Sequence, residues 1–364
     1  MTENVFGELV PVIQQDLCIH CGKCEKICPS LHGGEMQLHS PLACYAAWLP
    51  GDKINSRCAS GGCSYGIGKH IIENGGVVFG VRFMDGVLQH TYAEDIAGLG
   101  DFCGSKYVQS FIGESYREAE NFLKAGREVF FAGTPCQIAG LKMFLGEKNY
   151  PNLFTADLIC HGVPPMKYLR EHLRPGFSDF DSLQVQFRSQ DDGYCIRAAN
   201  GRQTYSRAHW TLDPYCNGFM QGVICRDSCF QCPFAQTKRT GDLTLGDFWG
   251  LDRKTLKTPD PARWISAVLV NTPQGEKLWE RVSGDFIQES RPPEEAVRGN
   301  WNLHSPSRIP PDRAAFRSHY PQKGFKGAMA ETQIPRNVRY CALKRMLKKI
   351  LFPERIRKFL SGRK

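Results

Sequence analysis

"EVFFAGTPCQIAGLKMFLGEKNYPNLFTADLIC", residues 128–160, combines two short apolar runs with a helical pattern between them. The apolar runs, EVFFAG and LFTADLIC, are typical of strands that are buried in a sheet. The segment QIAGLKMFLG between them is predicted to be a helix. A strand, a helix and a second strand in this order favour a parallel sheet with helices packed on it.

The flanking residues extend this alternation in both directions. Upstream, YGIGKHIIENG predicts a helix ending at Gly75, GVVFGVRF predicts a strand, and SYREAENFLKAG predicts a helix from the cap Ser115 to Gly126. Downstream, a helix is expected near residues 167–173, and the period-two alternation from SLQVQFRS to RQTYSRA indicates antiparallel strands. GDLTLGDFWG and ISAVLVNT are again strands, followed by the helix PQGEKLWERV. The predicted fold class is α/β with α+β elements: a mostly parallel sheet flanked by helices, with an antiparallel insertion.

Composition divides the chain into four segments. Residues 1–42 have too few large apolar side chains to fold on packing alone. Residues 43–290 are expected to form the main domain. Residues 291–335 are rich in Pro, Arg and Asn and are expected to wrap the surface. Residues 336–364 form a basic tail with apolar residues at helical spacing, namely Leu343, Met346, Leu347 and Ile350.

Charge and hydropathy exclude several classes of protein. The chain of 364 residues is 41% hydrophobic, which allows a sizeable core. It has no apolar run of about eighteen residues and no signal sequence, so we expect a cytoplasmic protein. Residues 336–364 carry eleven Lys or Arg and one Glu, whereas the whole chain has a formal net charge of +9. The body is therefore nearly neutral, and since no nucleic-acid-binding module is recognisable, we expect no nucleic-acid partner.

The strongest local motif is C-x2-C-x2-C-x3-C-P, at Cys18, Cys21, Cys24, Cys28 and Pro29. This spacing brings three thiolates onto one tight loop, and in ferredoxins with two such motifs the fourth cysteine serves the other cluster. Only one copy is present, so the last ligand is Cys28, another cysteine such as Cys44, or none. A structural zinc site usually pairs two separate C-x2-C knuckles. Residues 1–42 are therefore predicted to be a small ferredoxin-like 4Fe-4S module.

A second group of cysteines is predicted at the edge of the sheet. ICRDSCFQCPF contains Cys225 and the C-x2-C pair Cys229 and Cys232, which can supply two ligands. Two more thiolates must come from elsewhere. Cys136 and Cys160 are candidates because both follow the carboxyl ends of predicted parallel strands, where ligands bind in open sheets. The alternative is that both are buried structural thiols.

Other residues are weaker candidates, each with an ordinary structural alternative. Ser60, Gly61 and Gly62 precede a predicted helix and can hold a diphosphate, although such a turn is usually a cap and a bend. His161 can act as an acid or base, or be structural. Lys106 can neutralise a phosphate or a flavin anion, or be a solvated lysine. The pair Phe248 and Trp249 can stack on a ring or pack in the core.

Seven ordered motifs resemble those of the coenzyme F420 hydrogenase/dehydrogenase beta-subunit family: ACYAAW, SGG, GSKYVQS, GTPCQIAGLK, DLICHGVP, SCFQCPFA and GDLTLGDFWG. The resemblance runs from about residue 43 to residue 272, with the ferredoxin-like module in front. It implies an iron–sulfur flavoprotein in which FAD and a 4Fe-4S cluster exchange electrons with a second redox partner. Many bacterial relatives look like accessory proteins of polysaccharide-synthesis gene sets.

The resemblance also implies roles for individual residues. Cys136, Cys160, Cys229 and Cys232 would hold a cluster near the flavin, giving one or two 4Fe-4S clusters in the chain. The FAD site would be lined by Ser60, Gly61, Gly62, Lys106, Tyr107, Gln109, Gly133, Thr134, Pro135 and Gln137. The candidates for a catalytic role are His161 and Lys106. Cys58, Cys63 and Cys225 are additional to the family's pattern, either as redox-active thiols or as small hydrophobic residues.

The predicted function is an oxidoreductase that passes electrons from a reduced carrier, through 4Fe-4S centres and FAD, to an unknown small-molecule substrate. The carrier is expected to be an electron-donor protein such as a ferredoxin, or a reduced coenzyme of the F420 type. Two other interpretations stay open: a non-catalytic electron-relay subunit that docks on another enzyme, and a zinc-stabilised binding protein. The basic tail is expected to lie on the inner face of a membrane or contact a partner, or else to be a solvated helix.

Overall fold

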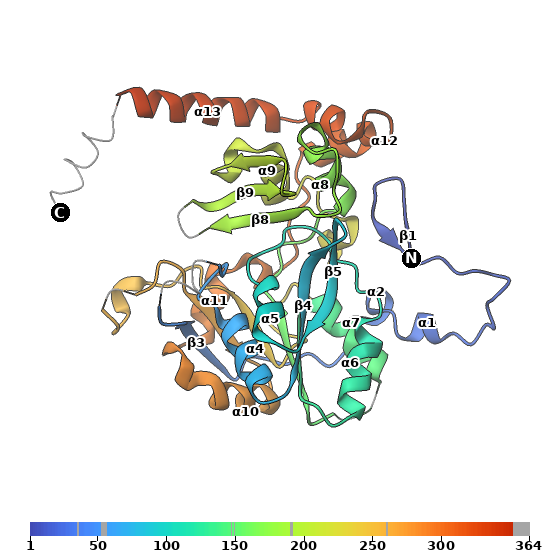
Figure 1. The fold of residues 1–364 in the computed structure, drawn as a ribbon, viewed down its shortest axis with the longest axis vertical. Coiled ribbons are helices and arrows are strands. Elements are labelled where there is room, and N and C mark those ends of the chain that lie inside the picture. Colours follow the sequence, from blue (N-terminus) through green and yellow to red (C-terminus); the bar gives the residue numbers. More distant parts are fainter. Residues whose placement is uncertain are drawn as a thin grey trace.

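The computed structural model describes residues 1–34, 36–51, 57–146, 148, 150–189, 192–259 and 261–351. Within these residues the strands form an eight-stranded central sheet, a three-stranded antiparallel sheet and a two-stranded N-terminal ribbon (Figure 1). The strands are β1 (Thr2–Glu3), β2 (Leu9–Val10), β3 (Ala43–Trp48), β4 (Val77–Met84), β5 (Val87–Ala93), β6 (Val129–Gly133), β7 (Leu153–Leu158), β8 (Gln184–Ser189), β9 (Gly193–Ala199), β10 (Thr204–Arg207), β11 (Leu243–Asp247), β12 (Ser266–Val270) and β13 (Ile287–Arg291). The helices are α1 (Lys23–Lys26), α2 (Pro29–His32), α4 (Cys63–Glu73), α5 (Ile96–Asp101), α6 (Ser115–Lys124), α7 (Pro135–Leu145), α8 (Met166–Leu173), α9 (Pro214–Met220), α10 (Pro273–Val282), α11 (Pro293–Gly299), α12 (Asp312–Ala330) and α13 (Ile334–Leu351).

The central sheet has the strand order β13-β3-β12-β11-β7-β6-β4-β5. Its middle strands β4, β6, β7 and β11 pair in parallel. Strand β3 points the same way, because β3 and β11 are both antiparallel to β12. Only β5, β12 and β13 run in the opposite direction among the described strands of this sheet. The prediction of an α/β fold with a mostly parallel sheet flanked by helices is confirmed.

Both faces of the central sheet are covered by helices, which explains why EVFFAG is apolar throughout. Successive side chains of a strand point to opposite faces. Phe130 packs on one face with Ile67 of α4 and with residues of α10. Phe131 packs on the other face with Leu123 of α6 and Leu141 of α7. A strand buried on both sides has no polar face to present, and the period-two alternation is lost.

The predicted antiparallel insertion is confirmed as the sheet β10-β9-β8, which has a core of its own. Phe187 of β8 packs there with Tyr215 of α9 and with Phe316 and Phe325 of α12. Residues 291–335, which we expected to wrap the surface, thus supply core side chains. Helix α12 contains Pro321 and a kink at Gly324, so its apolar residues lie on two short helical pieces and do not show one continuous period.

The start of α6 differs from the prediction, and the basic tail is helical in its described part. The N-cap of α6 is Glu114, whereas Ser115 is buried and donates its hydroxyl to the carbonyl of His90 at 2.9 Å. The basic tail is helical as far as Leu351, and residues 352–364 lie outside the described residues. Among the described helices, none is long and apolar enough to span a membrane.

Candidate functional site

Cys136 and Cys160 lie at the same edge of the central sheet because of the register of β6 and β7. The two strands are parallel neighbours, and Gly133 pairs with Asp157. Each cysteine follows its paired residue by three positions. Cys136 is exposed in the first turn of α7, and Cys160 is partly buried in the loop after β7. The two thiols are therefore delivered to one place by two strand ends.

Cys229 and Cys232 join them from a distant part of the chain. Cys229 lies in a short 3-10 turn, Asp227–Gln231, and Cys232 follows it directly. Burial raises the pKa of the Cys160 thiol well above its usual range, and the charges of Cys229, Cys136 and Cys232 raise it further. Burial likewise raises the pKa of Cys229 to about 11, with contributions from Cys136 and Cys232. These four residues are close enough to act on one another, and we call them the inner thiol group.

A buried ion pair holds the loop after Cys232 against β7. The side chains of Arg239 and Asp157 are 1% and 0% exposed, and Arg239 Nη2 donates to Asp157 Oδ1 at 2.8 Å. The same carboxylate accepts hydrogen bonds from the backbone N–H and the hydroxyl of Thr240. Arg239 also donates to the carbonyl of Phe234, two residues after Cys232. This pair was not predicted from the sequence, although a lone acid within LFTADLIC is a sign of a buried partner.

Cys225 lies beside the inner thiol group, buried against Gly162. A Cβ on Gly162 would stand 3.1 Å from Cys225 Sγ and 3.3 Å from Cys229 Cβ. Gly162 also has a φ of +118°, which side chains disfavour. Glycine therefore lets the chain after Cys160 turn past both cysteines. Cys225 is 2% exposed, and burial raises the pKa of its thiol.

The turn that carries Cys136 is fixed by a capping box at the start of α7. The backbone N–H of Thr134 donates to Gln137 Oε1 at 3.0 Å, and Pro135 is the first helical residue. Thr134 Oγ1 lies 3.1 Å from Cys136 Sγ. The predicted residues Gly133, Thr134, Pro135 and Gln137 thus form one rigid turn around this thiol.

A buried histidine links this turn to the GSKYVQS segment. Gln137 Nε2 donates to Ser110 Oγ at 2.8 Å, and Ser110 Oγ lies 3.2 Å from His90 Nδ1. His90 Nε2 is 3.0 Å from the carbonyl of Ala132, which can only accept, so the proton is on Nε2. Burial lowers the pKa of His90 to about 4. His90 and Ser110 connect two predicted cofactor motifs, and neither residue was predicted from the sequence to belong to the site.

The Ser60–Gly62 turn is used for packing as well as for a helix start. The Gly61 N–H donates to Ser266 Oγ at 3.0 Å, and a Cβ on Gly61 would lie 2.3 Å from the carbonyl oxygen of Ala47. Gly62 is the N-cap of α4, with a φ of 81°. Ser60 Oγ is buried without a hydrogen-bond partner among the described residues. Within this turn, the Ser60 hydroxyl is the group whose missing hydrogen bond a bound cofactor can supply.

Lys106 is not a solvated surface lysine. Its ammonium group donates to three carbonyls at the end of α5 and just beyond it, those of Asp101, Phe102 and Cys103, at 3.2, 2.8 and 2.7 Å. Burial lowers the pKa of Lys106 to about 8. These three carbonyls therefore accept the hydrogen bonds of the Lys106 ammonium group, which we had predicted to neutralise a phosphate or a flavin anion.

Two other predicted residues of this region, Tyr107 and His161, contact Phe219 of α9. The Tyr107 ring stacks on Phe219 at 4.6 Å between centroids. His161 Nε2 is 3.3 Å from the carbonyl of Phe219, and burial lowers the pKa of His161. The Gln109 N–H donates to Pro164, whereas its Oε1 is buried with no hydrogen-bond partner within the described part of the chain. Gln109 Oε1 is therefore a second polar atom that a cofactor can satisfy.

A cleft of about 550 Å³ opens between the loop after α5 and the antiparallel sheet. Its lining includes Arg57, Cys103 and Lys106 on one side, and Val185 and Tyr205 on the other. The cleft therefore runs along the GSK residues of GSKYVQS and has basic groups at its rim.

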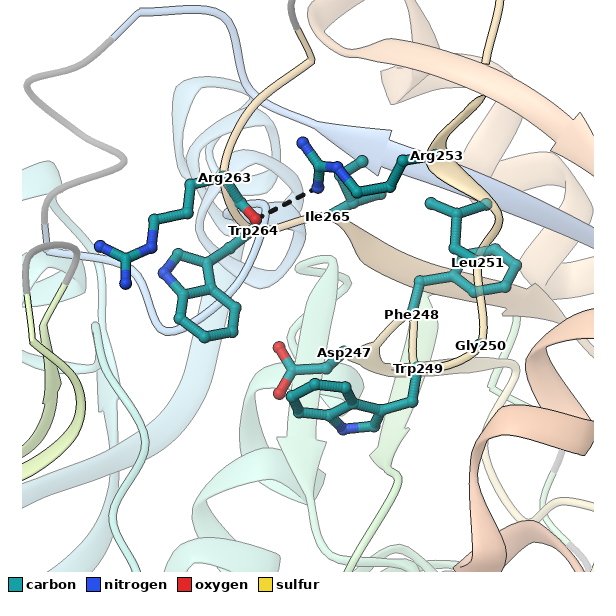
Figure 2. Close-up of a pocket in the computed structure, with 9 residues that line it drawn as sticks. All are labelled: Asp247, Phe248, Trp249, Gly250, Leu251, Arg253, Arg263, Trp264 and Ile265. Carbon is teal, nitrogen blue, oxygen red and sulfur yellow. Dashed lines mark hydrogen bonds between the residues drawn. The ribbon is translucent and has the colours of Figure 1, made fainter. Parts of the chain in front are cut away.

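A smaller hollow of about 260 Å³ lies at the end of β11 (Figure 2). Figure 2 shows the carboxylate of Asp247 and the rings of Trp249 and Trp264 around the same space. Asp247 Oδ2 accepts from buried Arg188 at 2.7 Å, and Asp247 Oδ1 has no hydrogen-bond partner among the described residues. Phe248 is buried in the core, whereas Trp249 is 43% exposed. The hollow can hold a ring against an indole, with Asp247 as an acceptor.

The N-terminal cysteines are exposed or half-buried, and they lie on the segment that includes α1 and α2, where α2 packs against α7 (Figure 1). Gly22 has a φ of 67° and turns the chain ahead of α1, and Cys28 is the N-cap of α2. A Cβ on Gly33 would stand 2.7 Å from the Phe234 ring, and α2 contacts α7. The segment with Cys18, Cys21, Cys24 and Cys28 thus borders two of the segments that supply the inner thiol group.

The chemistry of the donors fits iron–sulfur clusters. Both cysteine groups offer thiolates only, the usual donor set of 4Fe-4S clusters. A 4Fe-4S cube separates its ligands by iron and sulfide atoms, so they stand further apart than the ligands of one ion. Within the described residues, no three His, Cys, Asp or Glu side chains converge closely enough for a single metal ion.

Comparisons with known proteins extend this description. The family model for the C terminus of the coenzyme F420 hydrogenase/dehydrogenase beta subunit matches residues 126–295. A 4Fe-4S binding domain matches residues 10–34. Among solved structures, a chain of the xenon-derivatised F420-reducing [NiFe] hydrogenase complex from Methanosarcina barkeri is 16% identical, with a TM-score of 0.47 over 72% of this chain and 91% of that chain. No curated protein matches the sequence. The family model confirms the resemblance over residues 126–295, and the match to a 4Fe-4S binding domain confirms the predicted N-terminal 4Fe-4S motif.

Proposed function

We propose that this chain, which carries the C-terminal domain of the coenzyme F420 hydrogenase/dehydrogenase beta subunit behind a 4Fe-4S binding domain, is an iron–sulfur flavoprotein oxidoreductase. It passes electrons from a reduced carrier, through 4Fe-4S centres and FAD, to a small-molecule substrate. The observation that carries the proposal is the inner thiol group, in which cysteines from three separate segments lie near one another. Helix α2 of the N-terminal module contacts α7, which carries one of these cysteines. When bound, the clusters supply single electrons and FAD combines them into pairs.

Each part of the chain has a defined task in this proposal. Cys136, Cys160, Cys229 and Cys232 hold the inner cluster, and the N-terminal cysteines hold the outer one. The Asp157–Arg239 pair positions the loop that supplies two of the inner ligands. Ser60 and Gln109 hold FAD, a role that their buried polar atoms support, since neither atom has a partner among the described residues.

The electron carrier is proposed to be a protein that docks on the N-terminal module. Three apolar side chains around the first cysteines, Ile13, Leu17 and Ile19, are 53%, 71% and 84% exposed. Exposed apolar side chains beside a redox centre are suited to a partner surface. The resemblance to bacterial relatives suggests polysaccharide biosynthesis as the setting. An electron-relay subunit docking on another enzyme is the second candidate function, favoured by the exposed apolar residues of α13.

The first test counts cofactors in the anaerobically purified protein. We expect about eight iron atoms if both clusters are present, with one FAD, and absorbance near roughly 400 nm that dithionite bleaches. The variants C160S and C229S are expected to lose about half of the iron, because each removes an inner ligand.

C225S is the matched control, since Cys225 is adjacent and buried but outside the inner thiol group. It should keep the wild-type iron content. A colourless wild-type protein that holds zinc and no flavin would instead support the zinc-stabilised binding protein. Equal iron loss in C225S and C160S would remove the assignment of the four inner ligands.

A further inference from the structure

Two cysteines outside both cluster groups are in contact at the 550 Å³ cleft, and one of them, Cys103, lines it. The side chains of Cys58 and Cys103 are in hydrogen-bond contact. Arg57 Nη2 donates to the carbonyl of Gly100 at 3.1 Å, and a Cβ on Gly104 would lie 3.6 Å from the carbonyl oxygen of Arg57. These contacts pack the two segments against each other and hold the two sulfur atoms together.

The two thiols have different surroundings. Cys103 lines the cleft and is half-buried, whereas Cys58 lies behind it and is 8% exposed. The contact with Cys58 lowers the pKa of Cys103 to about 7, and the charges of Lys106 and Arg57 contribute. The same contact, together with burial, raises the pKa of Cys58. An accessible thiol that ionises near neutral pH, backed by a second thiol, is the usual arrangement of an attacking and a resolving cysteine.

We propose that Cys58 and Cys103 form a thiol–disulfide exchange site that takes small aliphatic disulfides carrying acidic groups. Arg57, Lys106 and Arg197 line the cleft together with one acid, Asp101, and this excess of basic side chains in the lining favours a negatively charged substrate. The site uses none of the cluster ligands, so it does not depend on the proposed clusters.

The exchange has two balanced steps. The Cys103 thiolate attacks one sulfur of the substrate disulfide, a mixed disulfide forms, and the first substrate thiolate leaves. Cys58 then attacks Cys103 Sγ, the Cys58–Cys103 disulfide forms, and the second substrate thiolate leaves. The two protein thiols lose two electrons and two protons, and the substrate disulfide gains both as two thiols.

The chain contains a matched control pair in Cys195 and Cys216. Cys216 Sγ donates to the carbonyl of Cys195 at 3.7 Å, and the two residues are 1% and 4% exposed. They are neighbours, as Cys58 and Cys103 are, but neither lines the cleft. If proximity alone caused disulfide formation, both pairs would form a disulfide. An exchange site predicts a disulfide only between Cys58 and Cys103.

The experiment treats the full-length, anaerobically purified protein with oxidised glutathione at pH 7.5. Remaining thiols are then alkylated in denaturant, and peptides are mapped by mass spectrometry. We expect a Cys58–Cys103 disulfide in most chains, with Cys195 and Cys216 alkylated. In C58S, glutathione should remain on Cys103, whereas C103S should leave Cys58 unmodified.

The acidic preference is tested with cystamine, a cationic disulfide of similar chemistry. Cystamine should form the link roughly tenfold more slowly at low salt, because the basic rim repels it. Equal rates would overturn the acidic preference. Absence of the link in the wild-type protein, or equal linkage of Cys195 and Cys216, would overturn the exchange site. Neither result depends on iron or flavin content, so failure of the proposed function would be recognised separately.

Discussion

At the scale of single residues, His90 makes the stability of the protein depend on pH. Burial lowers its pKa from 6.5 to about 4. Between these values the unfolded chain binds a proton that the folded chain does not, so the stabilisation is complete above pH 6.5 and is lost as the pH falls through 4. We expect the free energy of unfolding, measured with urea, to fall by about 2 kcal/mol more between pH 7.5 and 5 in the wild type than in H90Q.

The glutamine in H90Q keeps an N–H that can donate to the carbonyl of Ala132 but cannot titrate. H70Q, at a partly exposed position of α4, is the control and should follow the wild-type profile. If H90Q and the wild type lose the same free energy over this range, another group governs the acid sensitivity.

Residue positions that follow from local order were predictable, whereas contacts between distant segments were not. Cys136 and Cys160 could be placed because each comes directly after a strand. The hydrogen bond from the Gly61 N–H to Ser266 Oγ joins residues 205 positions apart, and no local sequence pattern predicts it. Lys106 was equally hidden, because the three carbonyls that hold it depend on how α5 ends.

At the scale of elements, the Asp157–Arg239 pair joins β7 to the loop that carries two inner thiols. Removing one partner of a buried pair leaves an uncompensated charge, which typically costs about 3–5 kcal/mol. We expect R239M to lower the free energy of unfolding by about that amount, and also to lose inner-cluster iron. Urea unfolding and iron analysis on the same samples measure both effects.

The Arg281–Glu128 pair is a control of similar geometry at the surface. Its N–O distance is also 2.8 Å, but its side chains are 29% and 31% exposed. E128Q is expected to cost less than about 1 kcal/mol and to keep all of its iron. If R239M matched E128Q in both measurements, the loop would be held by its other contacts and the ion pair would have no positioning role.

Elements with a clear period were predicted well, and elements interrupted by Pro or Gly were not. The apolar run EVFFAG and the helix after it were found at nearly their observed bounds. Helix α12 was missed because Pro321 and Gly324 break its pattern, although Phe316 and Phe325 on either side are buried. A segment rich in Pro and Arg is therefore not always a surface loop, because its few apolar residues can still pack in the core, as Phe316 and Phe325 do.

At the scale of the whole molecule, α13 presents both basic and apolar side chains to solvent. Ile334 is buried at its start and α13 packs on α9, whereas Leu343, Met346, Leu347 and Ile350 are exposed (Figure 1). Lys and Arg lie between these residues, and there is no acid in the helix. We expect the protein to sediment with anionic vesicles at low salt, and the double variant L347S/I350S to bind at least about tenfold more weakly.

Vesicles of zwitterionic lipid are the control, because they lack the charge that attracts Lys and Arg. Binding to both kinds of vesicle with equal strength would mean that charge plays no part. If the wild-type protein does not sediment with anionic vesicles, the membrane prediction is wrong and the apolar residues of α13 are suited to a protein partner instead.

The fold class and the order of its layers were predictable, but the junction between the two sheets was not. Arg188 of β8 donates to Asp247 at the end of β11, and its guanidinium lies over the rings of Tyr194 and Trp264. A period-two pattern indicates a strand, but it does not say which second sheet that strand will meet.

The register of β6 and β7 has a consequence for how such a chain can vary over evolution. Cys136 and Cys160 stand at equal offsets from the paired residues Gly133 and Asp157. An insertion or deletion between strand and cysteine in either segment would shift one thiol away from the other three. Homologous chains should therefore keep the two spacings of three residues unchanged.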